Sequence, residues 1–333
     1  MKESNTQKEL SRVPRTLSES SNTKVLEGLF DAGGTVMSDI IIYVASSQMK
    51  DLFGDCWFSI NDFCEVMGYE RTKLQRKLTE KQLDFLFSNQ RPVYITEQNG
   101  QKIEHPIENT FEAALYRLGT SNLSVAYAMN GKTQYKFIQI LDRFEIKDNF
   151  GTKKRTKRNY NVHLSKDLMN TLLTEYNLLE LKDYRNLPNR KGYRKFYLNL
   201  AKMIYLIKYK TTKNEAPFYV LTVDQLAKKL GIEIAEPKDR KKKVASILKK
   251  MNTYLKYTNF NFSFVKGDHE RWAYTVLFSF PRHTLHYFDE GQYAVVVKKF
   301  YKNLLGLYVE IAYPDTDMAV RRKKIKEVEE DAG

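Results

Sequence analysis

Cysteine and histidine are scarce in this sequence. Its 333 residues include two cysteines, Cys56 and Cys64, and five histidines, and none of them stands in the spacing that metal ligands need. A disulfide framework is therefore excluded, and neither a zinc site nor another cofactor is expected. Both cysteines lie among apolar residues, which indicates core positions in a protein of a reducing compartment.

Long apolar runs are also missing. The longest, around residues 39–45, is far too short to span a membrane. Residues 1–22 are polar and lack the apolar segment of a secretory signal. We therefore expect a cytoplasmic protein with no membrane partner, which starts with a flexible basic tail at residues 1–24.

Positive charge, in contrast, is abundant. Lysine and arginine number 55 against 40 aspartates and glutamates, a formal net charge of +15. Such an excess suits a polyanionic partner, because each neutralised phosphate releases counterions. A basic soluble protein without that partner has the same composition, so the distribution of the charge must separate the two. The length fits two domains, and 42% hydrophobic residues can build their cores.

Two segments far apart in the chain share one pattern. Residues 59–68 and 222–231 each begin with a hydroxyl residue, followed three positions later by Asp62 or Gln225, as in a capping box. Apolar residues then recur at i, i+3, i+4 and i+7, which lines one face of a helix. Each segment ends at a glycine, where the chain can turn with positive φ. The pattern predicts two helix-turn-helix units.

A second helix is expected after each turn, over residues 70–87 and 239–256. The first places Leu74 and Leu78 inward, and the second has an inward apolar stripe. Seven of the thirteen residues at 238–250 are basic, which fits a recognition helix in a DNA major groove. A solvated lysine face on an isolated helix looks the same, but the position after a turn favours DNA. The expected contacts are Thr72, Gln75 and Arg76 in the first unit and Arg240, Lys241, Lys242, Lys243, Ser246, Lys249 and Lys250 in the second.

A strand pair follows the second unit. Residues 259–265 and 272–280 alternate apolar and other side chains with period two, and a polar connector with a glycine joins them. This predicts a β-hairpin with a charged tip, where Lys266 and Arg271 are expected to contact DNA.

The first unit carries a similar pair, at residues 137–146 and 159–164. A basic loop at the tip of a hairpin is typical of a wing, which holds backbone phosphates or enters a minor groove. A basic localisation tract would not need flanking strands. The wing residues expected to contact DNA are Lys153, Lys154, Arg155, Lys157 and Arg158.

The expected fold is therefore α+β, with two tandem winged-helix domains at residues 25–172 and 173–290. A leading helix opens each domain, over residues 36–48 and 193–208, although residues 40–44 of the first also fit a strand. A C-terminal helix and charged tail follow at residues 291–333.

Two motifs suggest enzymatic activity, but the flanking residues and the spacing do not fit the sites that such activity needs. Residues 126–133 fit a loose P-loop, which needs a strand before it and a helix after it. Asn130 and Gly131 instead stand between two strand-like runs and predict a hairpin turn. His283 and His286 lack the spacing of a rolling-circle nicking site, and no acidic cluster suggests a two-metal nuclease. We therefore expect neither ATP binding nor catalysis.

The order of helix, helix-turn-helix and basic wing, repeated twice, resembles the plasmid replication initiator (Rep) proteins. The similarity is closest over residues 221–281, which look like the second winged helix of that family, and residues 137–173 look like the end of its first. The insertion at residues 89–122 and the basic tip at 153–158 depart from the family pattern.

The resemblance implies a specific function. Such initiators bind repeated sites at a plasmid origin, help to open the duplex and recruit host replication proteins, including the replicative helicase. They commonly exist as homodimers that repress their own promoter and as monomers that bind the origin repeats. By position, the second recognition helix would read bases, the first would read them more weakly, and the wings would hold the backbone.

Two other functions stay open. A transcription regulator can use the same DNA-binding parts without a role in replication, although it usually carries a ligand pocket or a dimerisation domain as well. An RNA-binding or structural protein is disfavoured, because the sequence has no glycine-aromatic RNA motif and has two predicted wings.

Overall fold

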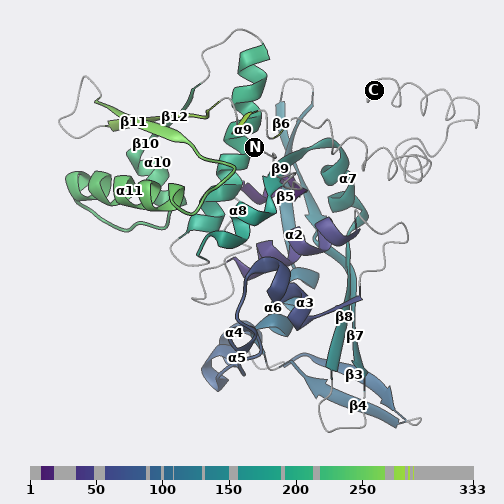
Figure 1. The fold of residues 1–333 in the computed structure, drawn as a ribbon. Coiled ribbons are helices and arrows are strands. Elements are labelled where there is room, and N and C mark those ends of the chain that lie inside the picture. The colour runs from purple at the N-terminus through teal and green to yellow at the C-terminus, as the bar shows by residue number, and fades with distance from the viewer. Residues whose placement is uncertain are drawn as a thin grey trace, which may run out of the picture.

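A computed structural model gives the fold of the chain (Figure 1). It describes residues 9–18, 35–48, 57–87, 91–98, 101–107, 109–129, 132–149, 157–188, 192–212, 218–266, 274–281, 284–285 and 288. Within these residues, helices alternate with small antiparallel sheets, so the expected α+β class is confirmed. None of the helices described is long and apolar enough to cross a membrane. The expected C-terminal helix at residues 291–333 lies outside the described residues.

The elements fall into two stretches of the chain. Up to residue 174 they are β1 (Leu10–Pro14), the 3-10 helix η1 (Arg15–Ser18), α2 (Val36–Gln48), β2 (Trp57–Ser59), α3 (Ile60–Met67), α4 (Arg71–Leu74), α5 (Glu80–Phe87), β3 (Val93–Gln98), β4 (Gln101–Pro106), α6 (Thr110–Gly119), β5 (Asn122–Met129), β6 (Lys132–Gln139), β7 (Leu141–Asn149), β8 (Lys157–Leu164) and α7 (Lys166–Thr174). From residue 176 they are β9 (Tyr176–Glu180), α8 (Leu181–Asn186), α9 (Tyr193–Thr212), β10 (Tyr219–Thr222), α10 (Val223–Lys229), α11 (Pro237–Asn252), β11 (Asn261–Lys266) and β12 (Tyr274–Ser279).

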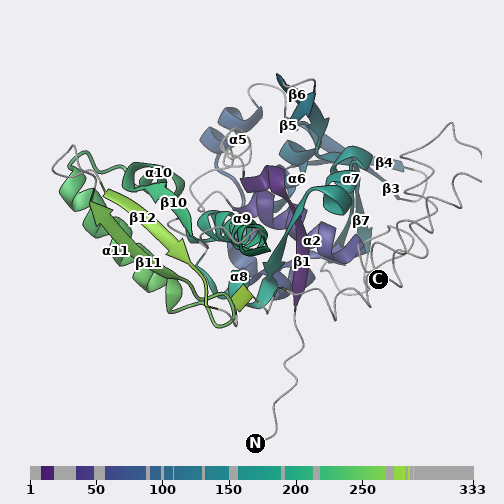
Figure 2. The ribbon, with the colours of Figure 1, turned by 90° about the horizontal axis from the view of Figure 1, so that it is seen from above.

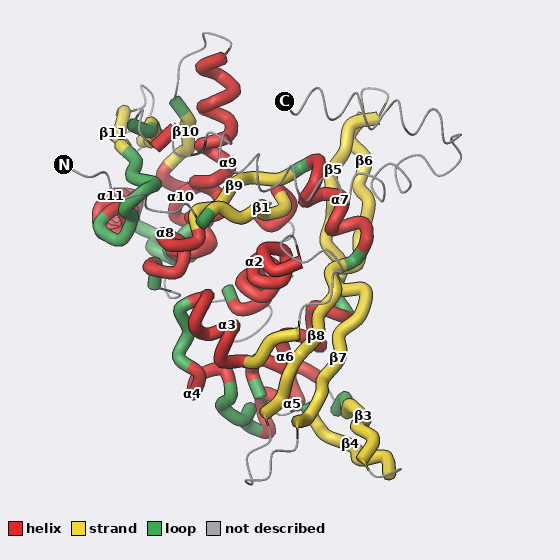
Figure 3. The backbone as a smooth tube through the Cα atoms, turned by 45° about the vertical axis from the view of Figure 1, so that its right-hand side comes forward, coloured by secondary structure: helices red, strands yellow, loops and turns green. Residues whose placement is uncertain are grey.

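Helix α2 forms the centre of the first stretch (Figure 3). It spans Val36–Gln48, as the sequence predicts, and Ile40, Ile41 and Val44 are fully buried. It packs against α3, α6 and β8. A cluster of aromatic rings continues this core, with Phe111 5.1 Å from Tyr160 between ring centroids. Burial of so many large side chains around one helix explains why α2 needs no amphipathic pattern.

The first expected helix-turn forms as the sequence predicts. At the start of α3 the Ser59 backbone N–H donates to the Asp62 carboxylate at 2.8 Å, and the Asp62 N–H donates to the Ser59 hydroxyl at 3.3 Å. The helix ends at Gly68, whose φ of 69° lies in the left-handed region. Both the capping box and the glycine turn are therefore confirmed.

The helix expected over residues 70–87 is wrong. The structure has one turn, α4, and then a separate helix, α5, which starts at Glu80. Between them Lys77 forms an antiparallel bridge with Asn109, which is extended pairing that a helix does not allow. Leu74 and Leu78 are buried as expected, although they do not share one helix.

The strand expected over residues 137–146 is also divided. β6 ends at Gln139 and β7 begins at Leu141. The fully buried Ile140 lies between them: its N–H donates to Ser121 O at 3.3 Å, in register with the β5–β6 pair, and its carbonyl accepts from the Ser165 N–H at 2.9 Å, just after β8. β7 and β8 then form an antiparallel hairpin, as expected for this region, in the sheet β2-β8-β7. The tip of this hairpin, residues 150–156, lies outside the described residues.

Two further hairpins lie in the first stretch. β3 pairs with β4, and together with α6 these strands account for most of residues 89–122. β5 pairs with β6 in a register that joins Met129 to Lys132. The P-loop-like segment therefore continues into a strand and not into a helix, which confirms the hairpin prediction.

The second stretch places a helix-turn-helix beside a three-stranded sheet. α9 begins at Tyr193, as predicted, and continues to Thr212. α10 and α11 follow, and β10, β12 and β11 form an antiparallel sheet in that order. α9 lies between this group of elements and the first stretch, which includes α2 and α6 (Figure 2).

The expected flexible tail at residues 1–24 is wrong for the residues that the structure describes there. β1 pairs antiparallel with β9, from Leu10 opposite Glu180 to Pro14 opposite Tyr176. Arg12 is buried and its guanidinium carbon lies 4.0 Å from the Tyr176 ring centroid. This segment is polar and its partner is distant in sequence, so local periodicity does not reveal it.

Candidate nucleic-acid interface

The α10–α11 unit is built by its own sequence. A capping box starts α10: the Thr222 N–H donates to the Gln225 side chain at 3.0 Å, and the Gln225 N–H donates to the Thr222 hydroxyl at 3.1 Å. Gly231 has a φ of 64° in the turn, and the Ile232 N–H donates to Ala227 O at 2.8 Å to close it. Pro237 occupies the first turn of α11, where a missing N–H costs no hydrogen bond.

Helix α11 has two unlike faces. Val244, Leu248 and Met251 on one side are fully buried, and the helix packs against α10. The other side carries five of the expected contact residues in exposed positions, namely Lys242, Lys243, Ser246, Lys249 and Lys250. Within the described part of the chain, the one carboxylate that forms an ion pair with them is Asp239, 3.5 Å from Lys242 Nζ, and such a surface pair contributes little. The exposed face is therefore strongly positive.

Arg240 and Lys241 face inward and play a different part. Arg240 forms an ion pair with Asp224, and its guanidinium donates at 2.7 Å to Ile234 O and at 2.7 Å to Ala235 O. These bonds tie the connection between α10 and α11 to the helix. Arg240 therefore shapes the unit, and few of its donors stay available for a phosphate.

Lys241 joins α11 to the hairpin. Its Nζ lies 3.3 Å from the centroid of the Tyr274 ring and 5.2 Å from that of Phe264, both within cation–π range. Tyr274 is on β12 and Phe264 on β11. The contact fixes the hairpin relative to the helix.

A groove runs between α11 and β11. Its helical wall is basic and its strand wall is aromatic, so it combines charge with apolar surface. The lining residues are Lys238, Lys241, Lys242, Ala245, Lys249, Asn252, Phe260, Asn261, Phe262, Ser263 and Phe264. Lys266 is exposed at the end of β11, and Arg271 lies outside the described residues.

The first unit has fewer candidate DNA-contact residues on a helix surface than α11 has. Thr72, Gln75 and Arg76 are exposed, but only Thr72 lies within the single turn of α4. The Gln75 side chain accepts a 2.8 Å hydrogen bond from Arg71 Nε. No long helix carries these three residues, so they do not form a continuous reading face.

The basic cluster of the β7–β8 hairpin is described only in part. Lys153, Lys154 and Arg155 lie outside the described residues, and Lys157 begins β8. Arg158 Nη1 lies 2.7 Å from the buried carboxylate of Glu112, which also accepts a 3.0 Å hydrogen bond from the Tyr160 hydroxyl. The charge of Arg158 is therefore balanced inside the fold.

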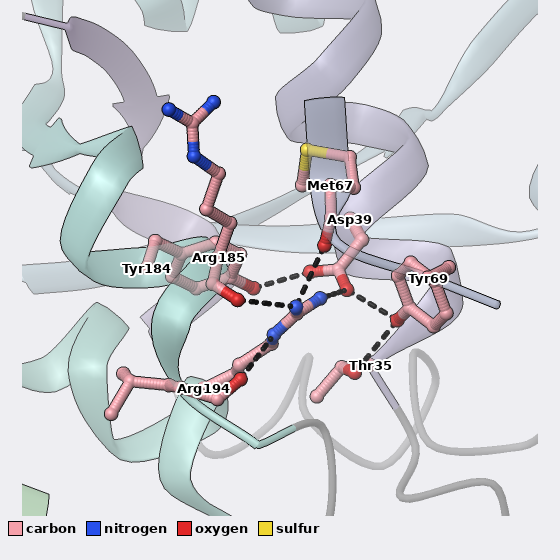
Figure 4. A network of polar contacts seen from close by, with 8 residues as sticks. Thr35, Asp39, Met67, Tyr69, Tyr184, Arg185 and Arg194 are labelled. Atoms are coloured by element: carbon pink, nitrogen blue, oxygen red, sulfur yellow. Dashed lines mark hydrogen bonds and ion pairs between the residues drawn. The ribbon is translucent and has the colours of Figure 1, made fainter. Parts of the chain in front are cut away.

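A buried polar network connects the two stretches, and sequence reasoning missed it (Figure 4). Arg194, 1% exposed, lies with Nη1 2.7 Å from the carboxylate of Asp39, which is fully buried. The hydroxyls of Tyr69 and Tyr184 both donate to the same carboxylate. Burial and the negative charge of Asp39 raise the pKa of both tyrosines well above its ordinary value.

The same arginine binds the turn of the first unit. Arg194 Nη2 donates at 2.7 Å to Met67 O and at 3.3 Å to Arg185 O. Burial opposes the charged form of Arg194, but the attraction of Asp39 outweighs it and raises the pKa. A signal was present in the sequence, because Asp39 is a single carboxylate within the apolar run of α2.

Cys64 lies in the core of the first stretch. Burial raises the pKa of the Cys64 thiol to about 11, with a smaller opposing effect from Arg71, so the reactive thiolate is disfavoured. This agrees with its interpretation as a core residue. His283 and His286 lie outside the described residues, and within the described ones no group of three potential metal ligands converges.

The chain matches no protein-family model and no curated protein. Its function is therefore inferred from the geometry of the α10–α11 unit and from the sequence pattern.

Proposed function

We propose that this protein binds duplex DNA sequence-specifically through a winged helix made of α10, α11 and the β11–β12 hairpin. The observation that carries the proposal is the exposed face of α11. Lys242, Ser246 and Lys249 project from a helix whose other face is fully packed. A helix held in this way directly after a helix-turn is suited to enter a major groove, where lysine and serine can bond to base edges and phosphates.

The sheet beside α11 supports the same arrangement. Lys241 holds the hairpin against the helix, so the groove between them keeps its shape. A phosphate backbone along this groove would contact the lysines of α11 and Lys266 at the end of β11. The first stretch, with its own helix-turn and the basic β7–β8 hairpin, serves as the partner in a tandem pair of winged helices, with the weaker contacts to bases.

The proposed biological role is initiation of replication at a plasmid origin. Support comes from the order of elements and from the resemblance of residues 221–281 to the second winged helix of Rep proteins. In this role the protein binds repeated origin sites in the cytoplasm, recruits host replication proteins such as the replicative helicase, and as a homodimer represses its own gene. It performs no catalysis of its own.

A transcription regulator without a replication role is the second candidate. The observation in its favour is the short α4, since a chain with one long reading helix suits a single operator half-site as well as an origin repeat.

One binding experiment separates the two roles. Purified protein is tested by gel shift against fragments of DNA that surround its gene, across a salt series and with competitor DNA. The initiator role predicts selective binding to a fragment with directly repeated sites, with a logarithmic salt slope of about 0.9 per phosphate contacted. Binding to a single promoter-like palindrome alone would favour the regulator. Equal binding to all fragments would overturn sequence-specific recognition.

A further inference from the structure

A second group of basic side chains lies on α9 and α10, away from the exposed face of α11. Lys195, Asn199 and Lys202 are spaced at i, i+4 and i+7 on α9, which places them in one stripe along the helix. Lys229 belongs to the last turn of α10 and meets this stripe: its Nζ donates to Asn199 Oδ1 at 2.7 Å.

The amide at the centre of the group is held in position. Asn199 is 6% exposed, and its Nδ2 donates to Lys195 O at 3.1 Å. Its oxygen is therefore aimed at Lys229. The helices also meet closely here, because a Cβ added at Gly192 would lie 2.8 Å from Leu230 O. Backbone contact thus fixes the start of α9 against the end of α10.

These lysines repel one another. Burial lowers the pKa of Lys229, and the charges of Lys202 and Lys195 lower it further. Neither Lys202 nor Lys229 forms an ion pair with any residue in the described part of the chain, and the one side-chain hydrogen bond of Lys229 goes to a neutral amide. The repulsion between Lys202 and Lys229 destabilises the fold when no anion is bound, and clusters of this kind are frequent at binding sites.

The end of a helix does not explain the group. Cations near the C-terminus of α10 interact favourably with its dipole, but Lys228 supplies that charge as well and is exposed. Only Lys229 turns toward the α9 stripe and becomes partly buried beside two further lysines. Lys229 loses part of its hydration in this half-buried position, whereas an exposed lysine such as Lys228 can interact with the helix dipole without that loss.

We propose that Lys195, Lys202 and Lys229 form a phosphate-binding site, with Asn199 as the residue that orients Lys229. The Lys229 ammonium at the Asn199 amide, together with the two lysines of the neighbouring α9 stripe, suits a phosphate group with two or more negative charges. The phosphate comes either from a DNA backbone outside the major groove or from a small phosphorylated compound. In the first case the site extends the proposed DNA interface and rests on the proposed function, and in the second it is independent of it.

The test compares the double variant Lys195→Gln/Lys202→Gln with the matched control Lys228→Gln. In chloride alone, we expect the double variant to unfold at a higher temperature than the wild type, because repulsion is relieved; this also shows that it folds. Inorganic pyrophosphate at matched ionic strength should raise the unfolding temperature of the wild type and of Lys228→Gln. The double variant should lose that response.

Binding to duplex DNA forms the second arm. If the site holds a backbone phosphate, the logarithmic salt slope of the double variant falls by about 1 relative to Lys228→Gln. If pyrophosphate stabilises the wild type and the slope does not change, the site takes a small phosphorylated compound. An equal response to pyrophosphate and an equal slope in both variants overturn the proposal. A wild type without salt-dependent duplex binding overturns the proposed function instead, and the pyrophosphate arm still decides the site.

Discussion

The two helix-turns of this chain are built alike and surrounded differently. Both start with a reciprocal capping box and both turn at a glycine in the left-handed region, with φ of 69° at Gly68 and 64° at Gly231. A Cβ added at Gly68 would lie 3.0 Å from Arg185 O, whereas one added at Gly231 has no neighbour within 4 Å. The same local pattern therefore forms a turn at Gly68 that packs against the second stretch, which we call the anchor, and an open turn at Gly231 that precedes a long basic helix.

Local sequence determines the conformation of each turn, while tertiary contacts determine whether the turn is packed and how long the helix after it is. Around Met67 the turn supplies a carbonyl to the buried Arg194, and the helix after it is one turn long. A Cβ at Gly231 would meet nothing, and α11 extends to Asn252. The following changes test or sharpen this contrast, from the largest expected effect to the smallest.

The largest effect is expected at the anchor itself. Arg194→Met leaves the fully buried carboxylate of Asp39 without its cation, and removal of one partner of a buried pair typically costs about 3–5 kcal/mol. Urea unfolding measures the change. Arg185→Met is the matched control, because its partly exposed pairing with Glu9 at 3.1 Å should contribute less than about 1 kcal/mol. Equal destabilisation by both variants would show that the network is not an anchor.

The next effect concerns DNA recognition. Lys242→Gln with Lys249→Gln should relax base preference and weaken binding to the preferred site by about 1–3 kcal/mol for each base-reading side chain removed. Thr72→Ala with Gln75→Ala should have a smaller effect, because these residues do not share a long helix. Competition gel shifts with specific and random duplexes measure both. A larger effect from the first unit would reverse the roles given to the two turns.

The residues that the sequence predicts for the wing provide the control for this assignment. Lys153→Gln with Arg155→Gln should lower affinity for all sequences and reduce the logarithmic salt slope by about 1 per phosphate contact. A change in sequence preference from these two, together with none from α11, would contradict the assignment.

The two glycines allow a direct comparison. Alanine in the left-handed region costs roughly 1–2 kcal/mol at either position. We expect Gly68→Ala to be more destabilising than Gly231→Ala in chemical unfolding, because only the first methyl group meets a backbone carbonyl, that of Arg185. Equal effects would indicate that the first turn relaxes away from its neighbour.

A smaller effect is expected between α11 and the hairpin. Lys241→Met should remove a cation–π interaction of about 0.5–2 kcal/mol and increase hydrogen exchange in β11. Lys241→Arg keeps a cation over the rings and should retain most of the protection. Because the ammonium group lies on Tyr274, the salt slope of DNA binding should change less with Lys241→Met than with Lys242→Gln.

The smallest effect is a dependence of stability on pH. The pKa of Lys229 is lowered in the folded protein from 10.5, so between the lowered pKa and 10.5 the unfolded chain binds more protons. The contribution of Lys229 to stability should therefore rise with pH through that window. The rise should shrink in Lys195→Gln/Lys202→Gln, whose lysines no longer repel it. Unfolding free energies at several alkaline pH values, compared between the two proteins, measure it.

Much of the local structure follows from sequence, and the departures have specific causes. Both capping boxes, the bounds of α2 and the start of α9 are set by residues within one or two turns, so their patterns predict them correctly. The break after Gln75 is set by the bridge between Lys77 and Asn109, which no local pattern reports.

In the candidate site, too, some features follow from local sequence and others depend on tertiary contacts. The exposed face of α11 follows from helical spacing, and Lys242 and Lys249 are exposed as expected. The inward positions of Arg240 and Lys241 depend on partners in other elements, Asp224 and Tyr274. A count of basic residues does not distinguish these two from the residues proposed to read bases. Lys195 and Lys202 share one face of α9, but only its packing against α10 brings Lys229 to them.

The pairing of β1 with β9 has a consequence for the order of synthesis. Leu10 lies opposite Glu180, so β1 leaves the ribosome long before its partner β9 is translated. At about 5–20 residues per second the delay is roughly 10–30 s, far longer than a local helix needs to form. During that time the strand has an unsatisfied edge, which is a potential site for aggregation or chaperone binding. Among the described strands, β1 is therefore translated first but pairs only after β9, which follows it by about 170 residues, has been made.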